Sequence, residues 1–262
     1  MSDRGLYDRI SEGYAQARRG DARIEGQIHS ALGDAATVLN VGAGTGNYEL
    51  SDRLVVALEP STAMIAQRAA DAAPVVRGVA EHLPFPDGSF DVAMATLTVH
   101  HWPEVGAGLR EMARVAPRQV IFGFDAAEAG RMWLLDYFGA GLDAPSERNA
   151  PTASDVAQHL DVFEVQVVPV PADCIDGFGH AYWARPHAYL QPAVQASISL
   201  IAQMSPDARA AASAHLARDL ESGAWDERYG HLRTMQEIDC GYRLVVAGQS
   251  QRGGPASGCS AR

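Results

Sequence analysis

The sequence lacks lysine altogether, so its 21 basic residues are all arginines, against 32 acidic residues. The net charge of −11 and one short basic pair, Arg18-Arg19, provide no positively charged stripe. Proteins that bind nucleic acid neutralise the phosphate backbone with such a stripe. The composition therefore argues against DNA or RNA as the main partner, and the lysine-free bias itself is typical of a GC-rich genome.

Cysteine is equally sparse. The three cysteines, Cys174, Cys240 and Cys259, are far apart, and none forms a C-x-x-C pair. An odd number at these distances argues against a disulfide framework or a cysteine metal site. The nine histidines are scattered, and none occurs in an H-x-x-x-H pattern with a carboxylate. The sequence therefore predicts no metal site.

Long hydrophobic runs are also missing. No apolar stretch reaches the ~18 residues that a membrane-spanning helix requires, and the first residues, MSDRGLYDRI, lack the apolar segment of a signal peptide. Hydrophobic residues nevertheless make up 47% of the chain, enough to build a full core. We expect a cytoplasmic protein without a membrane partner, either a monomer or a homodimer.

The most informative stretch is TVLNVGAGTGNY, residues 37–48. A short apolar run leads into a turn that contains Gly42, Gly44 and Gly46, which predicts a buried strand, a tight turn and the start of a helix. Such a turn brings backbone N–H groups close to a ligand. The dinucleotide fingerprint G-x-G-x-x-G requires a further glycine where this chain has Asn47, so the pattern favours a ligand other than NAD.

Strand-like and helix-like segments alternate from this turn onward. This alternation predicts an α/β fold with a parallel sheet and helices on both faces. We expect strands at residues 37–41, 54–58, 75–77, 90–95, 119–124, 162–170 and 240–247, with helices at 48–52, 61–73, 104–115, 186–204 and 206–220. One domain, residues 1–247, would comprise an N-terminal helical lid (1–35), a cofactor-binding core (36–125) and a helical insertion (175–235), followed by a flexible tail (248–262).

Two further features follow the second and third expected strands. Glu59 ends an apolar strand, where a carboxylate can accept hydrogen bonds from both ribose hydroxyls of an adenosine ligand; the alternative is a surface acid at a strand end. Ala80 and Glu81 follow the next strand, where their backbone could face an adenine edge; read alone, they would be an ordinary acidic loop.

Taken together, the segments VLNVGAGTGNYE, VVALEPS and GVAEHLPFPDGSFDVAMATLTVHHW resemble class I S-adenosylmethionine-dependent methyltransferases. They look most like the branch related to ubiquinone- and menaquinone-biosynthesis methyltransferases. The resemblance is tight over residues 37–124 and implies a Rossmann-like, mostly parallel seven-stranded sheet. It also implies S-adenosyl-L-methionine as cofactor and S-adenosyl-L-homocysteine as product.

The resemblance implies a set of cofactor contacts. Gly42, Gly44 and Gly46 would meet the methionine and ribose, Glu59 the ribose diol, Pro60 the adenine, Ala80 and Glu81 the adenine amine, and Thr96 the methionine moiety. Ala43 and Met64 would also be cofactor-binding. One departure is Asn40, where the family commonly has an acid. An amide there can still accept a hydrogen bond or donate one to the ligand carboxylate.

Tyr7, Tyr14 and Arg18 share one face of an expected N-terminal helix. An ordinary amphipathic helix would explain them. The family often closes its cofactor with an N-terminal lid, in which an arginine or tyrosine could bind the methionine carboxylate. An aromatic ring there could also lie against the cationic sulfonium.

Three histidines are candidates for a general base. His100 and His101 follow the fourth expected strand, at the sheet edge where open α/β folds bind ligands. Since one of two adjacent residues usually faces inward, we expect at most one to be catalytic. His180 lies in the aromatic segment FGHAYW and is a second candidate, although packing of the insertion would also explain that segment.

The expected reaction is in-line methyl transfer to a small-molecule acceptor. The aromatic insertion suggests a flat, hydrophobic acceptor, and the composition and the segment RPHAYLQP resemble actinobacterial natural-product methyltransferases. Some of these methylate carbon on electron-rich rings such as indole. An NAD(P)-dependent oxidoreductase and a non-catalytic S-adenosylmethionine-binding protein are the alternatives, and the negative charge disfavours a nucleic-acid methyltransferase.

Overall fold

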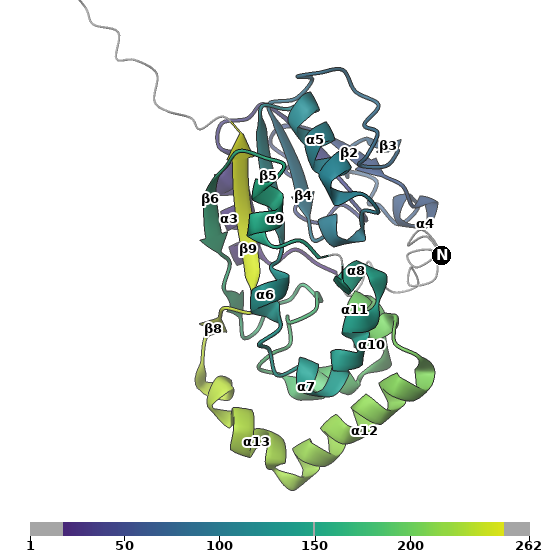
Figure 1. Cartoon of the computed structure of the whole chain (residues 1–262), viewed down its shortest axis with the longest axis vertical. Helices are drawn as coiled ribbons and strands as arrows, with labels where there is room; N and C mark the ends of the chain where they lie inside the picture. The colour runs from purple at the N-terminus through teal and green to yellow at the C-terminus, as the bar shows by residue number, and fades with distance from the viewer. Residues whose placement is uncertain (1–17, 149, 249–262) are drawn as a thin grey trace, which may run out of the picture.

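The fold is organised on a central seven-stranded sheet. A computed structural model describes residues 18–148 and 150–248 (Figure 1). The strand order is β3-β2-β1-β4-β5-β9-β6. The bounds are β1 Thr37–Val41, β2 Leu54–Glu59, β3 Val75–Arg77, β4 Val92–Thr96, β5 Arg118–Phe124, β6 Val162–Val167 and β9 Tyr242–Gly248. Within this sheet β9 runs antiparallel to both of its neighbours, β5 and β6, and the remaining strand pairs are parallel. The mostly parallel, seven-stranded α/β fold expected from the sequence is confirmed.

Both faces of the sheet are buried. Along β4, Val92 and Met94 pack on one face, while Ala93 and Ala95 pack on the other, as the two-residue period of a strand requires. The helix α3 (Ala22–Leu32) covers the first face, and α5 (Val105–Val115) and α9 (Ala153–Ala157) cover the second. The strand order reverses between β1 and β4, and α/β folds bind ligands at this position, outside the carboxyl ends of the strands.

A helical unit lies at one end of the sheet (Figure 1). Its helices are α6 (Ala126–Ala129), α7 (Leu135–Phe138), η2 (Gly139–Asp143), α8 (Pro145–Arg148), η3 (Pro186–Leu190), α10 (Pro192–Ser197), α11 (Ser199–Ala202), α12 (Pro206–Ser222), α13 (Ala224–Tyr229) and η4 (Gly230–Thr234). Trp133, which precedes α7, packs its ring against those of Tyr189 and Trp225 at 5.5 and 5.2 Å. The segment after β5 is thus joined to the insertion of residues 175–235.

Several expected elements differ from the structure. The helix expected at 61–73 is only α4 (Thr62–Ile65), because Arg68 turns inward to Glu49 and to the carbonyl of Ala73. No helix forms at 48–52, and the helix expected at 186–204 is broken into η3, α10 and α11, with Ile198 in an extended conformation. A two-stranded sheet, β7 (Val170–Pro171) with β8 (Glu237–Ile238), was not expected. The long helix beginning after Ser205 is confirmed, and Ser205 caps it.

The N-terminal region is described only in part. The helix α3 begins at the N-cap Asp21 and buries Ile24, Ile28 and Leu32 against the sheet, so this part of residues 1–35 forms a layer of the core. Tyr7 and Tyr14 lie outside the described residues, and so does the tail beyond Gly248. The lid therefore remains a prediction about residues 1–17. Within the described ranges, no helix is long and apolar enough to cross a membrane.

Candidate functional site

The glycine turn after β1 lies at the reversal point of the sheet. The backbone N–H groups of Gly42 and Ala43 donate to the Leu58 carbonyl at 2.8 and 3.0 Å, which fixes the turn to β2. Gly42 has φ +70°, and a Cβ there would lie 2.2 Å from Thr98 Oγ1. Gly44 has φ +53°, but no heavy atom lies within 4 Å of its Cβ position. Gly42 is thus required by packing, whereas Gly44 faces open space.

Glu59, the last residue of β2, is held by two backbone donors. Its carboxylate accepts hydrogen bonds from the N–H groups of Gly44 and Ser61, both at 2.8 Å. The residue is only 6% exposed. This burial raises the pKa of Glu59 above its ordinary value, and the two backbone hydrogen bonds act in the opposite direction. A carboxylate has about four lone-pair sites, so each oxygen can still accept a ligand hydroxyl.

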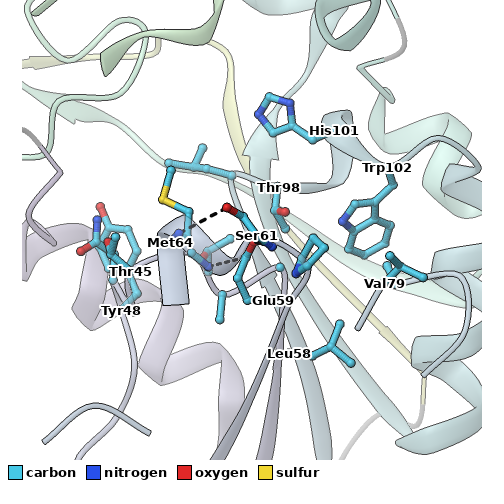
Figure 2. A pocket seen from close by; sticks show the side chains of 18 of the residues that line it. Thr45, Tyr48, Leu58, Glu59, Ser61, Met64, Val79, Thr98, His101 and Trp102 are labelled. Carbon is cyan, nitrogen blue, oxygen red and sulfur yellow. Dashed lines mark hydrogen bonds between the residues drawn. The ribbon is translucent and has the colours of Figure 1, made fainter. Parts of the chain in front are cut away.

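A cavity of about 250 Å³ opens between the glycine turn and the carboxyl ends of β1, β2 and β4. Figure 2 shows Glu59, Ser61 and Met64 between Tyr48 and Trp102 in this view. The expected cofactor contacts that line the cavity are Arg18, Gly42, Ala43, Gly44, Glu59, Pro60, Met64, Ala80, Glu81 and Thr96. Gly46, also expected there, is not among its lining residues and lies instead against Glu49 and Arg68. Thr98 and Trp102 line the cavity as well, and the sequence reasoning did not identify them as contacts.

A buried network of hydrogen bonds and one ion pair holds the glycine turn in place. Asn40 donates from Nδ2 to Glu49 at 3.0 Å, and Arg68 pairs with Glu49 at 2.7 Å. The Arg68 guanidinium also donates to the Gly44 carbonyl at 3.2 Å. Asn40, placed where the family commonly has an acid, therefore positions the turn through Glu49 and does not line the cavity. Glu49 and Arg68 were missed because nothing in the sequence pairs them.

A second buried network joins the glycine turn to the insertion. Asp176 is fully buried and accepts a hydrogen bond from the Tyr48 hydroxyl at 2.7 Å. The Arg18 Nε lies 2.6 Å from the other carboxylate oxygen of Asp176. Tyr48 itself has φ +65°, a conformation that is uncommon outside glycine. Arg18, which we expected at the methionine carboxylate, thus lines the larger cavity. It is also paired with Asp176, a residue that the sequence did not single out.

A smaller cavity of about 80 Å³ adjoins the larger one and shares Arg18, Leu97 and His101 with it. Its walls are largely apolar. Phe124, Phe178, Leu200 and Tyr242 contribute apolar surface. The polar lining residues are Arg18, His100, His101, Glu147, His180, Ser197 and Ser199. The segment FGHAYW therefore lies beside the carboxyl edge of the sheet, and the structure brings all three histidines expected as base candidates to one place.

The three histidines differ in their surroundings. His101 lines both cavities, and its ring lies 3.8 Å from that of His100. Burial, with smaller effects of His101 and Arg18, holds the pKa of His100 well below its ordinary value. Burial also lowers the pKa of His180 to about 4. A base is most effective when its pKa is near the working pH, so these shifts favour a hydrogen-bonding role for His100 and His180.

The low pKa of His180 predicts a pH-dependent stability. Because the folded value of about 4 lies below the ordinary 6.5, the unfolded chain binds the proton first as the pH falls. Stability present above pH 6.5 is then lost progressively towards pH 4. Wild type should lose about 2 kcal/mol more unfolding free energy between pH 7 and pH 5 than His180→Leu, as measured by urea denaturation. Equal losses in the two proteins would refute a neutral, buried His180.

Comparisons with known proteins agree with this geometry. The model of the family described as "Methyltransferase domain" matches residues 39–122. A solved structure from Anabaena variabilis, a methyltransferase assigned to an antibiotic biosynthesis pathway, is 32% identical. That match covers 89% of this chain and 100% of the other, with a TM-score of 0.81.

Curated relatives point to the same family. A demethylmenaquinone methyltransferase of Mycolicibacterium gilvum is 28% identical over 200 residues, 75% of this chain and 71% of that protein. An uncharacterized methyltransferase of Bacillus subtilis is 27% identical over 135 residues, and the match spans 46% of its length and 47% of this chain. The glycine turn, the buried Glu59 and the full-length match to the Anabaena protein together show that this chain belongs to the class I S-adenosylmethionine-dependent methyltransferases.

Proposed function

We propose that the protein transfers the methyl group of S-adenosylmethionine to a small, flat, hydrophobic acceptor. The observation that carries this proposal is the pair of adjoining cavities. The larger is lined by the glycine turn and Glu59, and the smaller has aromatic walls. Their shared residues, Arg18, Leu97 and His101, lie where a donor in one cavity would meet an acceptor in the other.

The residues of the larger cavity fit the donor. Glu59 keeps lone pairs for two ribose hydroxyls, and the open space at Gly44 lets the backbone approach a ligand closely. Val79, Ala80 and Trp102 provide an apolar wall that suits an adenine ring. When bound, S-adenosylmethionine supplies a methyl group that is already activated by positively charged sulfur, and S-adenosylhomocysteine is the product.

The protein contributes mainly by positioning the two reactants. Holding them in line can lower the barrier by ~7–11 kcal/mol. Leu97, which borders both cavities, has φ +53° and donates from its N–H to the Phe122 carbonyl at 2.6 Å. Strained backbone of this kind commonly occurs where a structure must hold a functional group in place. We assign to Leu97 and His101 the separation and alignment of donor and acceptor.

The acceptor class follows from the smaller cavity. Its aromatic lining favours a flat ring, and the Anabaena protein's assignment to an antibiotic pathway favours a natural-product acceptor. An electron-rich ring such as indole can attack the methyl group through a ring carbon without first losing a proton. The S–CH₃ bond breaks as the C–CH₃ bond forms, and the ring proton is lost to solvent afterwards. That chemistry suits a site in which the pKa values of His100 and His180 are lowered by burial. In this proposal residues 36–125 bind the donor, and the insertion of residues 175–235 covers the acceptor.

Glu59→Gln should weaken binding of S-adenosylhomocysteine by about 10- to 100-fold, as measured by calorimetry. The loss follows because hydrogen bonds to a charged group contribute ~1.5–3 kcal/mol each. Glu111→Gln is the matched control, since Glu111 also accepts a backbone N–H, from Leu83 at 2.8 Å, but lies outside both cavities. Unchanged affinity in Glu59→Gln would contradict the donor site.

The reaction itself is tested with S-adenosylmethionine that carries a tritiated methyl group and a panel of aromatic acceptors that includes indole. We expect label in an organic product whose mass has increased by one methylene unit. Consumption of NADH, when it is added to the same mixtures, without methyl transfer would favour the oxidoreductase alternative. Binding of S-adenosylmethionine without transfer to any member of a broad panel would favour a non-catalytic binding protein.

A further inference from the structure

His180 is a polar side chain buried beside the smaller cavity. It is 7% exposed, and neither Nδ1 nor Nε2 has a hydrogen-bond partner among the residues that the structure describes. Leaving a buried donor or acceptor unsatisfied is costly, so native proteins rarely do so without a functional reason. The ring lines the smaller cavity, which makes a ligand group the natural partner.

Three other polar side chains of this cavity make contacts within the protein. Glu147 accepts a hydrogen bond from Ser199 Oγ at 2.7 Å. Arg18 is paired with Asp176 at 2.6 Å. His100 packs its ring against Phe124 at 4.9 Å and against His101 at 3.8 Å. Among the polar side chains of this cavity, His180 is the one whose two ring nitrogens are both buried and without a hydrogen-bond partner in the described part of the chain.

The walls beside His180 are aromatic and fixed by their own contacts. The rings of Phe178 and Tyr242 lie 4.6 Å apart, and the Tyr242 ring lies 6.0 Å from that of His180. The Tyr242 hydroxyl accepts a hydrogen bond from the His180 backbone N–H at 3.3 Å, which ties the insertion to β9. These contacts hold the imidazole at the edge of an apolar space.

We propose that His180 selects the acceptor, by forming a hydrogen bond with a hydroxyl or ring N–H group on an uncharged aromatic molecule that lies against Phe124, Phe178 and Tyr242. This inference rests on the proposed function, because it places the acceptor in the smaller cavity. A neutral imidazole offers one donor and one acceptor nitrogen, so it can pair with either side of a hydroxyl. His180 is then a specificity-determining residue.

Such a site discriminates between ligands through the hydrogen bonds that a poorer ligand fails to make. A pocket built to hydrogen-bond a polar group rejects an analogue that lacks the group, since its own buried atoms then stay unsatisfied. Phenol and toluene are matched probes, because they differ only in a hydroxyl against a methyl group. Their dissociation constants can be measured by NMR titration with the protein saturated with S-adenosylhomocysteine and again without it.

The ratio of phenol affinity to toluene affinity should fall about three- to tenfold in His180→Leu relative to wild type, as expected for the loss of one hydrogen bond. His180→Gln, whose amide can still donate and accept, should restore part of the ratio. In wild type, phenol but not toluene should shift the ring ¹⁵N resonances of His180. These resonances report the hydrogen bond itself, which a purely structural role of His180 would leave unmoved.

An unchanged ratio in both variants, phenol titrations that leave the His180 resonances in place, or no binding of phenol to wild type up to its solubility would each overturn the proposal. His180→Gln keeps the test valid if His180→Leu fails to fold. Failure of the proposed function gives a different result, namely no binding of S-adenosylhomocysteine to wild type. The phenol and toluene titrations without that ligand still report on His180.

Discussion

Gly44→Val should weaken binding of S-adenosylhomocysteine by about 100-fold, because forced overpacking costs about 1–3 kcal/mol. The Cβ of a residue at this position has no protein atom within 4 Å, so valine methyl groups would stand in the larger cavity. The φ of +53° adds strain, about 1–2 kcal/mol for a residue other than glycine. Calorimetry measures the affinity, and urea denaturation measures the strain separately.

Gly88→Val separates these two effects. Gly88 has φ +61° and likewise no heavy atom within 4 Å of its Cβ position, but it lines neither cavity. Both variants should lose a similar unfolding free energy, while only Gly44→Val loses the ligand. If a folded Gly44→Val protein bound S-adenosylhomocysteine with wild-type affinity, the glycine turn would not be part of the donor site. The proposed function would then lose its basis.

Asp176→Ala should lower the free energy of unfolding by about 3–5 kcal/mol, the usual cost of removing one partner from a buried ion pair. Asp176 is fully buried, and the Arg18 side chain is only 9% exposed. The same substitution should weaken binding of S-adenosylhomocysteine, since Tyr48 and Arg18 both line the larger cavity and both bond to this carboxylate. Urea denaturation and calorimetry measure the two effects.

Asp173→Ala is the matched control, because Asp173 lies in the same loop and pairs with Arg23, yet its side chain is 81% exposed. Its removal should leave both stability and affinity nearly unchanged. A double-mutant cycle of Tyr48→Phe with Asp176→Asn should give a coupling energy of at least about 0.5 kcal/mol. Additive effects in the cycle, or an Asp176→Ala protein as stable as Asp173→Ala, would show that this network does not join the turn to the insertion.

Most residues of the larger cavity, our proposed donor site, could be predicted because their signals are local. The apolar run of β1 leads directly into Gly42 and Gly44, and Glu59 ends the next strand. Each signal depends on spacing along the chain, and parallel strands bring their carboxyl ends to one edge whatever the details of packing. Most of the contacts implied by the resemblance accordingly line the larger cavity, with Gly46 as the exception.

The networks that hold this site could not be predicted in the same way. Asp176 lies 128 residues from Tyr48 and 158 from Arg18 along the chain. Glu49 and Arg68 are 19 residues apart. Arg68 pairs with Glu49 where local propensity favoured a helix over residues 61–73, and only α4 forms there. No period or spacing links such residues, since their contact depends on how distant segments pack.

The three histidines show the same difference between what the sequence predicts and what the packing decides. Their position after a strand, or within an aromatic segment, was enough to select His100, His101 and His180 from the sequence. Which of them is buried, which borders both cavities and which has no hydrogen-bond partner among the described residues depends on the packing of β4, the insertion and β9. Burial sets the pKa of an imidazole, and burial is a property of the folded chain alone.

The amino-acid order alone therefore specified the fold class and most residues of the larger cavity, because both depend on short-range patterns that parallel βα units place at one edge of the sheet. The smaller cavity, where we propose that the acceptor binds, became visible only in three dimensions. Its walls come from segments near residues 18, 97, 124, 147, 178, 198 and 242, and their shape and hydrogen bonding arise when distant segments are buried together.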